Sequence, residues 1–329
     1  MLFYSDPALM WRLCQKAFLG EQNTGVLSFF LGALHRILES RPEWITNQLL
    51  ALPKRIFAEE GEQEEGRVGG VYVNLILRLW LVYDQAQAGD QVRLWIQDPI
   101  KYSKFIGTTL TSLRSAIIQG DPERDDVLDQ RVRARTIELL HSVVATTVRI
   151  FADLSTRADL NEVEQKTAET SLHLIDLAAR EIFSGSGAYG VSRSDGQDRT
   201  DSKLTPQIRQ RFLREMGPTL EALCEGAYPS VIHSLLETLE VFVPDDPVGV
   251  FRLLTRALDA GGRTGGYQYE GMGAQLFVRI IRRYLADFRS VLVQHEDCRR
   301  GLMRVLDIFV EAGWPEARQL VYELPEMLR

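Results

Sequence analysis

The sequence predicts an all-α protein. Apolar residues recur with the 3.6-residue period of a helix along most of the chain, and no stretch convincingly alternates apolar and polar residues as a half-buried strand does. The pair Asp-Pro precedes an apolar periodic run four times, at residues 6–7, 98–99, 121–122 and 246–247. Because aspartate is favoured at an N-cap and proline at the first helical position, each pair predicts a helix start.

Taken in order, these signals and the similar restarts at Arg41-Pro42 and Gly313-Trp314-Pro315 predict a series of helices joined by short connections. The helices near 122–155 and 159–184 are longer than the others and predict a long antiparallel hairpin in the middle of the chain. The complete series is 7–19, 24–39, 42–59, 67–87, 100–119, 122–155, 159–184, 205–225, 228–242, 247–260, 270–292, 296–312 and 315–328.

The helices of the second half pair into units of roughly 40 residues, the spacing of HEAT and armadillo repeats. Successive amphipathic runs carry this pattern: YPSVIHSLLETLEVFV, DPVGVFRLLTRAL, AQLFVRIIRRYLADFRSVL and CRRGLMRVLDIFVEAG. Residues 228–328 resemble a HEAT/ARM-like α-solenoid, and residues 7–59 resemble one more weakly. The resemblance implies a stack of helix pairs whose surface binds other macromolecules. The long central hairpin departs from the pattern.

Residues 183–203, FSGSGAYGVSRSDGQDRTDSK, contain the glycine pattern G-x-G-x-x-G at 185–190. A dinucleotide-binding loop needs a strand before these glycines and a helix that begins at them. Here a predicted helix ends instead, at Phe183, and polar residues follow, so we interpret the stretch as a linker with Gly185 ending the helix. The predicted organisation is an N-terminal helical block at 1–184, a flexible linker at 185–204 and a C-terminal HEAT-like helical block at 205–329.

The composition is that of a folded protein without a general attraction to nucleic acid or anionic membrane. The chain has 45% hydrophobic and 25% charged residues and a net charge of −7. Its three cysteines form no C-x-x-C pair, its start lacks a signal-peptide pattern, and the most apolar stretch, Val71–Tyr83, is too short to span a bilayer. We therefore predict a cytoplasmic protein without membrane partners.

The predicted hairpin carries the one arrangement that could bind a metal. Glu138 and His141 lie three residues apart on its first helix, and His173 and Asp176 mirror them on its second, at matching heights. At about 100° per residue, however, His141 lies at the edge of the buried face of the first helix. On the second helix, His173 points in nearly the opposite direction from the buried face. We therefore predict no metal site here. A metal-dependent helical enzyme built on Glu138 and His141 remains a third alternative.

The sequence contains no H-E-x-x-H, G-x-S-x-G or G-x-x-x-x-G-K-[ST] motif, and His295-Glu-Asp297 is interpreted as a polar helix start before Cys298. We predict no catalytic residue and no cofactor, and enzymatic activity stays undecided with the balance against it.

Two neighbouring features are the best candidates for a partner surface. The stretch DAGGRTGGYQYEGMGAQ at 259–275 could be a binding loop or a plain helix connection. Residues 252–304 carry ten arginines against five acidic residues, which fits a phosphate-binding face, a docking site for an acidic protein or an ordinary solvated face. The predicted contact residues are Arg263, Tyr267, Tyr269, Arg279, Arg282, Arg283, Arg299, Arg300 and Arg304.

Together these observations predict a non-enzymatic helical scaffold or regulatory module that binds a protein partner. Such a module would fit a larger bacterial multi-component system. The alternative is a nucleic-acid-binding subunit that uses the arginine-rich face at 252–304.

Overall fold

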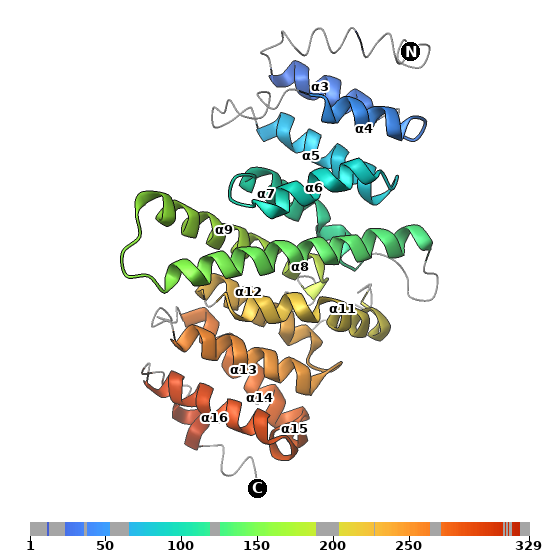
Figure 1. Cartoon of the computed structure of the whole chain (residues 1–329). Helices are drawn as coiled ribbons and strands as arrows, with labels where there is room; N and C mark the ends of the chain where they lie inside the picture. Colours follow the sequence, from blue (N-terminus) through green and yellow to red (C-terminus); the bar gives the residue numbers. More distant parts are fainter. Residues whose placement is uncertain are drawn as a thin grey trace. The chain divides into compact units, whose positions relative to one another are not determined.

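A computed structural model describes residues 12, 24–35, 38–52, 66–118, 126–188, 204–226, 228–263, 271–311, 313, 315 and 318–322 (Figure 1). Within these residues the protein is all-helical, with thirteen α-helices, one 3-10 helix and no strand, as the periodicity predicted. None of the helices in the described ranges is both long and apolar enough to cross a membrane. The predicted helix at 7–19 lies almost wholly outside these ranges, as does much of the one at 315–328.

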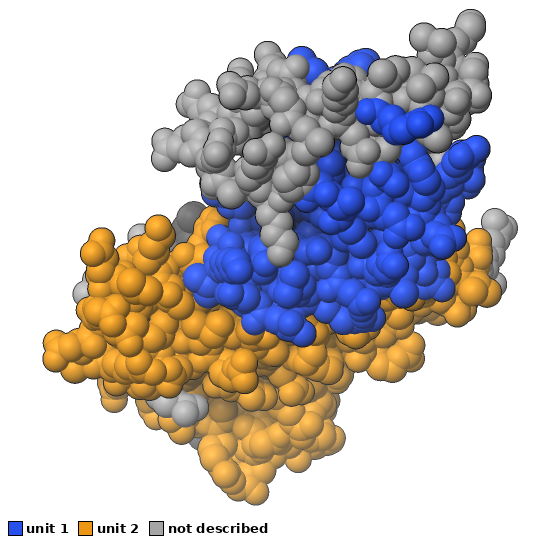
Figure 2. Space-filling model, turned by 45° about the horizontal axis from the view of Figure 1, so that its top comes forward, with its two compact units in different colours: residues 1–112 blue, residues 113–329 orange. Residues whose placement is uncertain are grey.

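The chain divides into two compact units, residues 1–112 and 113–329, which Figure 2 draws in different colours. The division falls between Ser112 and Leu113, at the end of a helix that the sequence analysis had placed inside its N-terminal block.

The first unit packs around a cluster of aromatic rings. Its helices are α3 (Thr24–Leu34), α4 (Pro42–Leu50), α5 (Gly66–Leu81), α6 (Ala86–Gln97) and α7 (Ser103–Leu113). Trp95 is fully buried, 6.3 Å from the ring of Tyr72 and 5.2 Å from that of Phe105 between ring centroids. Helices α5, α6 and α7 each contribute one ring to this cluster.

Helix α6 was not predicted, because few of its residues are strongly apolar. Its buried face consists of Ala88, Gly89, Val92 and Trp95, and two of these four are small. A Cβ on Gly89 would lie 2.7 Å from the indole ring of Trp80, so α6 approaches α5 more closely than any larger residue would permit. The small residues that weaken the hydrophobic pattern are therefore the ones that allow this packing.

The second unit begins with the 3-10 helix η3 (Arg114–Ala116) and is built on the predicted long hairpin, α8 (Val127–Ser155) and α9 (Glu162–Gly185). The two helices pack against each other, and then α8 packs on α11 (Pro206–Cys224) and α9 on α12 (Pro229–Phe242). The helices α13 (Pro247–Arg263), α14 (Gly271–Asp287), α15 (Arg289–Gln294) and α16 (Glu296–Glu311) complete the unit. Helix α13 contacts α11, α12 and α16, while α14 contacts α12 and α15.

Among the predicted proline signals, two succeeded and one failed. Pro42 and Pro247 each open a helix, and the Gly249 N–H donates to the Asp246 carboxylate at 2.9 Å, as an N-cap requires. Asp98 instead ends α6, and its carboxylate accepts from the Lys101 N–H in a turn before α7. The Asp-Pro pairs at 6–7 and 121–122 lie outside the described residues. An Asp-Pro pair therefore marks a turn, and the helix need not begin at the proline.

The predicted single helix at 270–292 is wrong, because the chain breaks at Phe288. The backbone of Phe288 (φ −129°, ψ 30°) leaves the helical region and separates α14 from α15. Neither glycine nor proline lies near the break. The short helix α15 buries Val291 and Leu292 and contacts both α14 and α16, so packing sets the change of direction.

The predicted linker at 185–204 falls inside the second unit. Its first residues are ordered by packing: Gly185, Ser186 and Ala188 are buried, and Gly187, at φ +80°, lies against Leu204. Helices on either side of the stretch also contact each other, since α8 packs on α11 and α9 on α12. Residues 189–203 lie outside the described ranges, so the flexibility of the segment stays a prediction.

Candidate functional site

The predicted partner residues lie on three helices. Arg263 is the last residue of α13, while the others lie on α14 (Arg279, Arg282, Arg283) and α16 (Arg299, Arg300, Arg304). Tyr267 and Tyr269 fall outside the described residues, as does most of the glycine-rich stretch between α13 and α14.

Four of these arginines contact acceptors of the protein itself, and three of the four pair with carboxylates. Arg279 donates hydrogen bonds to both carboxylate oxygens of Glu240, at 2.6 and 2.7 Å, and Arg283 donates to the backbone carbonyl of Glu240 at 3.0 Å. On α16, Arg300 pairs with Glu296 at 2.6 Å. Arg304 pairs with Asp259 of α13. The contacts of Arg279, Arg283 and Arg304 link helices of the unit, whereas the Arg300–Glu296 pair lies within α16.

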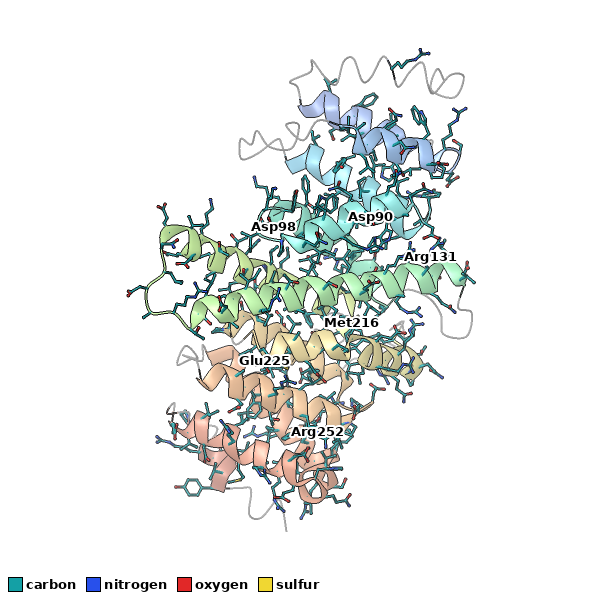
Figure 3. The ribbon with its side chains drawn as sticks, in the orientation of Figure 1. Asp90, Asp98, Arg131, Met216, Glu225 and Arg252 are labelled. Carbon is teal, nitrogen blue, oxygen red and sulfur yellow. The ribbon has the colours of Figure 1, made fainter. Side chains whose placement is uncertain are left out.

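Two further arginines of the region, Arg252 and Arg256, are also paired. Arg252, labelled in Figure 3, contacts Asp297 at 2.5 Å, and Arg256 contacts Glu225, also labelled, at 2.8 Å. These hydrogen bonds raise the pKa of both guanidinium groups and lower the pKa of the Asp297 carboxyl.

The local excess of positive charge in 252–304 is therefore offset in three dimensions. Glu225 and Glu240, on α11 and α12, supply counter-charges that a count along the segment leaves out. A phosphate group would have to displace these carboxylates. Within the described ranges, only Arg282 and Arg299 of the predicted set are exposed and make no ion pair.

The Glu138 and His141 pair lies in a pocket, but with a different partner helix from the one expected. His173 is exposed on α9, and Asp176 pairs with Arg180 at 2.8 Å. Glu138 and His141 instead line a pocket between α8 and α11, together with Glu215. No group of three or more His, Cys, Asp or Glu side chains among the described residues is placed to hold a metal ion.

This α8/α11 pocket has a volume of about 440 Å³. Across it, the Arg133 guanidinium donates to Glu215 at 3.1 Å, and the Arg133 side chain is nearly buried. Two further polar atoms, Nδ1 of His141 and Oγ1 of Thr219, are buried without a hydrogen-bond partner. The pocket is lined by Gln130, Arg133, Ala134, Ile137, Glu138, His141, Glu215, Pro218 and Thr219.

Of the lining residues, the sequence analysis named only Glu138 and His141. The polar residues Arg133, Glu215 and Thr219 were missed. They are separated from each other by up to 86 positions, and nothing in the chain says that α11 packs on α8. The unusual local feature is Pro218 inside α11, which has no N–H and leaves the carbonyl four residues earlier without its helical donor. This interior proline is the one sequence signal that could have identified the face of α11 that lines the pocket.

The outer end of the α8–α9 hairpin is a second candidate surface. In residues 149–170 Leu154 is the one buried residue, and Figure 1 shows the turn of the hairpin at the edge of the second unit. We call residues 149–170 the hairpin tip. Arg157 holds the turn by pairing with Asp153 at 2.5 Å and Glu164 at 2.9 Å, and Asn161 and Glu164 form a capping box at the start of α9. The tip is therefore an ordered and exposed surface.

Two cysteines of the second unit are predicted to be unreactive in the folded protein. Burial raises the pKa of the Cys224 thiol to about 12 and also raises the pKa of Cys298. Since the thiolate is the nucleophile, alkylation by iodoacetamide at pH 8 should be slow at both positions and should rise with pH or denaturant. Mass spectrometry of time points would show this, and rapid labelling of Cys224 without denaturant would contradict it.

Comparisons with models of known protein families, with curated proteins and with solved structures find no match for this chain. The functional proposal below therefore depends on the sequence and on the geometry of these surfaces.

Proposed function

We propose that the protein is a non-enzymatic helical scaffold or regulatory module that binds a protein partner. The HEAT/ARM-like resemblance and a cytoplasmic location belong to the same proposal. The observation that carries it is the hairpin tip, an ordered pair of helix ends that the rest of the chain leaves exposed. Preformed helical surfaces of this kind bind partners without a large ordering cost.

The composition of the hairpin tip supports a protein as its partner. Val163 is 75% exposed at the start of α9, and Ile150, Phe151 and Leu160 are each half-buried. Residues 149–170 also include five acidic and three basic side chains. Exposed apolar residues together with charged ones are typical of protein interfaces, and the acidic excess is unfavourable for a phosphate backbone.

The arginine-rich face supports nucleic acid less well, since its guanidinium groups are largely held by Glu240, Asp297, Glu225, Glu296 and Asp259. The contribution of each phosphate contact depends on the counterions it releases, and arginines already paired with carboxylates release fewer. Nucleic acid therefore stays the second candidate, with Arg282 and Arg299 as its unpaired cations.

The test is a pull-down of the tagged protein from its native lysate, with and without nuclease, in wild type and in Val163→Asp. We expect a stoichiometric protein that survives nuclease and is reduced at least about tenfold by the substitution, because an interface centre does not tolerate an unpaired charge. Aspartate in the first turn of α9 is compatible with folding, since negative charge is favourable there.

Val127→Asp is the matched control, because Val127 is 77% exposed and also lies in the first turn of a long helix. It should leave the partner bound. Recovery of nucleic acid, with protein partners lost after nuclease and with binding abolished by charge reversal at Arg282 and Arg283, would replace this proposal with the second candidate. Equal binding by wild type and both valine variants would exclude the hairpin tip.

A further inference from the structure

We propose that the α8/α11 pocket binds an organic cation with an alkyl stem, that is, a primary ammonium or a guanidinium group on a short hydrocarbon chain. The proposal concerns a binding site separate from the hairpin tip. It depends on the charges, the unpartnered atoms and the apolar walls of one pocket.

The charges around the pocket favour a single positive charge. Glu138 and Glu215 contribute two carboxylates, and Arg133 neutralises one of them through its bond to Glu215. One negative charge of the two carboxylates therefore remains. The Glu138 side chain makes no ion pair or hydrogen bond in the described part of the chain, so its carboxylate is available to a ligand.

The buried polar atoms of the pocket also lack partners. The Thr219 residue is fully buried, yet its Oγ1 makes no hydrogen bond, and neither does the buried Nδ1 of His141. A buried polar atom without a partner costs about 1–3 kcal/mol, and such atoms are uncommon in folded proteins. Both atoms can accept a hydrogen bond, and an ammonium group donates three and a guanidinium group five.

The apolar walls match a hydrocarbon stem. Ala134 and Ile137 on α8 and Pro218 on α11 line the same pocket as the acceptors. Long basic groups bind in this way, with the methylene stem along an apolar surface and the charged head at carboxylates. A volume of about 440 Å³ lies within the range of small-ligand sites, and it is large enough for a head group with four or five methylenes.

Two sources could provide this chemistry. One is a free aliphatic amine, and the other is a lysine or arginine side chain of the protein partner, which would rest on the function proposed above. The direct test is a titration of the full-length protein, labelled at isoleucine and threonine methyl groups, with n-pentylamine, n-butylguanidine and Nα-acetyl-lysine methylamide, each of which carries one positive charge. Neutral 1-pentanol serves as the matched probe without charge.

We expect saturable shifts of the Ile137 δ-methyl and the Thr219 γ-methyl with at least one cation and none with 1-pentanol. Response to n-pentylamine or n-butylguanidine alone would indicate a metabolite site, and response to the lysine derivative would indicate a binding site for a side chain of a partner. Shifts that do not saturate, shifts that occur equally with 1-pentanol, or no shifts at all would overturn the proposal. The titration needs no partner, so its failure is independent of the pull-down.

Two variants separate binding from folding. Glu138→Gln keeps the size of an exposed side chain and should weaken cation binding about tenfold, whereas Glu169→Gln, on the exposed face of α9, should change it less than twofold. Thr219→Val removes the unpartnered hydroxyl and should weaken binding about threefold without lowering the melting temperature. Binding unchanged in both Glu138→Gln and Thr219→Val would overturn the assignment.

Discussion

Replacing Gly185 with alanine is expected to destabilise the second unit by about 3 kcal/mol, near the upper end for overpacking a buried site. A Cβ at this position would overlap the carbonyl oxygen of Arg114 and lie 2.7 Å from Cδ1 of Ile117. The carbonyl belongs to the backbone of η3, so a side-chain rotation cannot relieve the overlap. The end of α9 and η3 would have to separate.

The measurement is amide hydrogen exchange along α8 and α9, together with thermal unfolding, because the protein has two units and a single unfolding transition is not assured. Gly32→Ala is the matched control, since a Cβ on Gly32 would meet nothing within 4 Å. It should leave the protein unchanged or up to about 1 kcal/mol more stable, as the helix propensity of alanine predicts. Equal stability of the two variants would mean that α9 and η3 do not contact as described.

Removing the Arg209 side chain is expected to destabilise the second unit by about 3 kcal/mol, the cost of leaving a buried charge without its partner. Asp245, in the turn after α12, has a side chain that is only 5% exposed, and Arg209 of α11 donates to it at 2.7 Å. Arg209 also donates to the Leu204 carbonyl at 3.0 Å. Arg209→Ala would therefore leave a buried carboxylate and an unpaired carbonyl.

Chemical denaturation followed by fluorescence would measure the loss. The double variant Arg209→Ala, Asp245→Asn should recover part of the stability, because it removes the stranded charge. Arg300→Ala breaks an ion pair of similar length, 2.6 Å to Glu296, in which both side chains are exposed. It should cost less than about 0.5 kcal/mol. Comparable losses in the two single variants would show that burial of Asp245 contributes little.

The sequence identified several residues of the candidate sites, but it did not identify the residues that contact them from other helices. Glu138 and His141 were singled out as a pair, and they do line a pocket, but their partner comes from α11 and not from α9. The arginines at 252–304 were recognised as a group, while their counter-charges on α11 and α12 were not. Periodicity and spacing report which residues share a helix face, and they contain no information on which helix covers that face.

Gly185 also shows the difference between what the local sequence predicts and what a contact with a distant segment decides. Its position after an apolar run predicted the end of a helix, and α9 does end there. The reason for a glycine is different from the one inferred, however, since the residue is buried against the backbone of η3, a segment about 70 positions earlier in the chain. The same contact helps to explain why the structure divides the chain after Ser112, whereas the composition of the linker suggested 185.

By itself the sequence determined the all-helical class, the long central hairpin and most helix starts, because these depend on hydrogen bonds and side-chain contacts within a few residues. Only the tertiary structure decided the helix α6, the break at Phe288, the ion pairs of the arginines and the α8/α11 pocket. Each of these depends on the approach of segments far apart in the chain, where small residues, buried charges and backbone atoms meet. Local propensity cannot predict such contacts, since their free energy arises only when the helices pack.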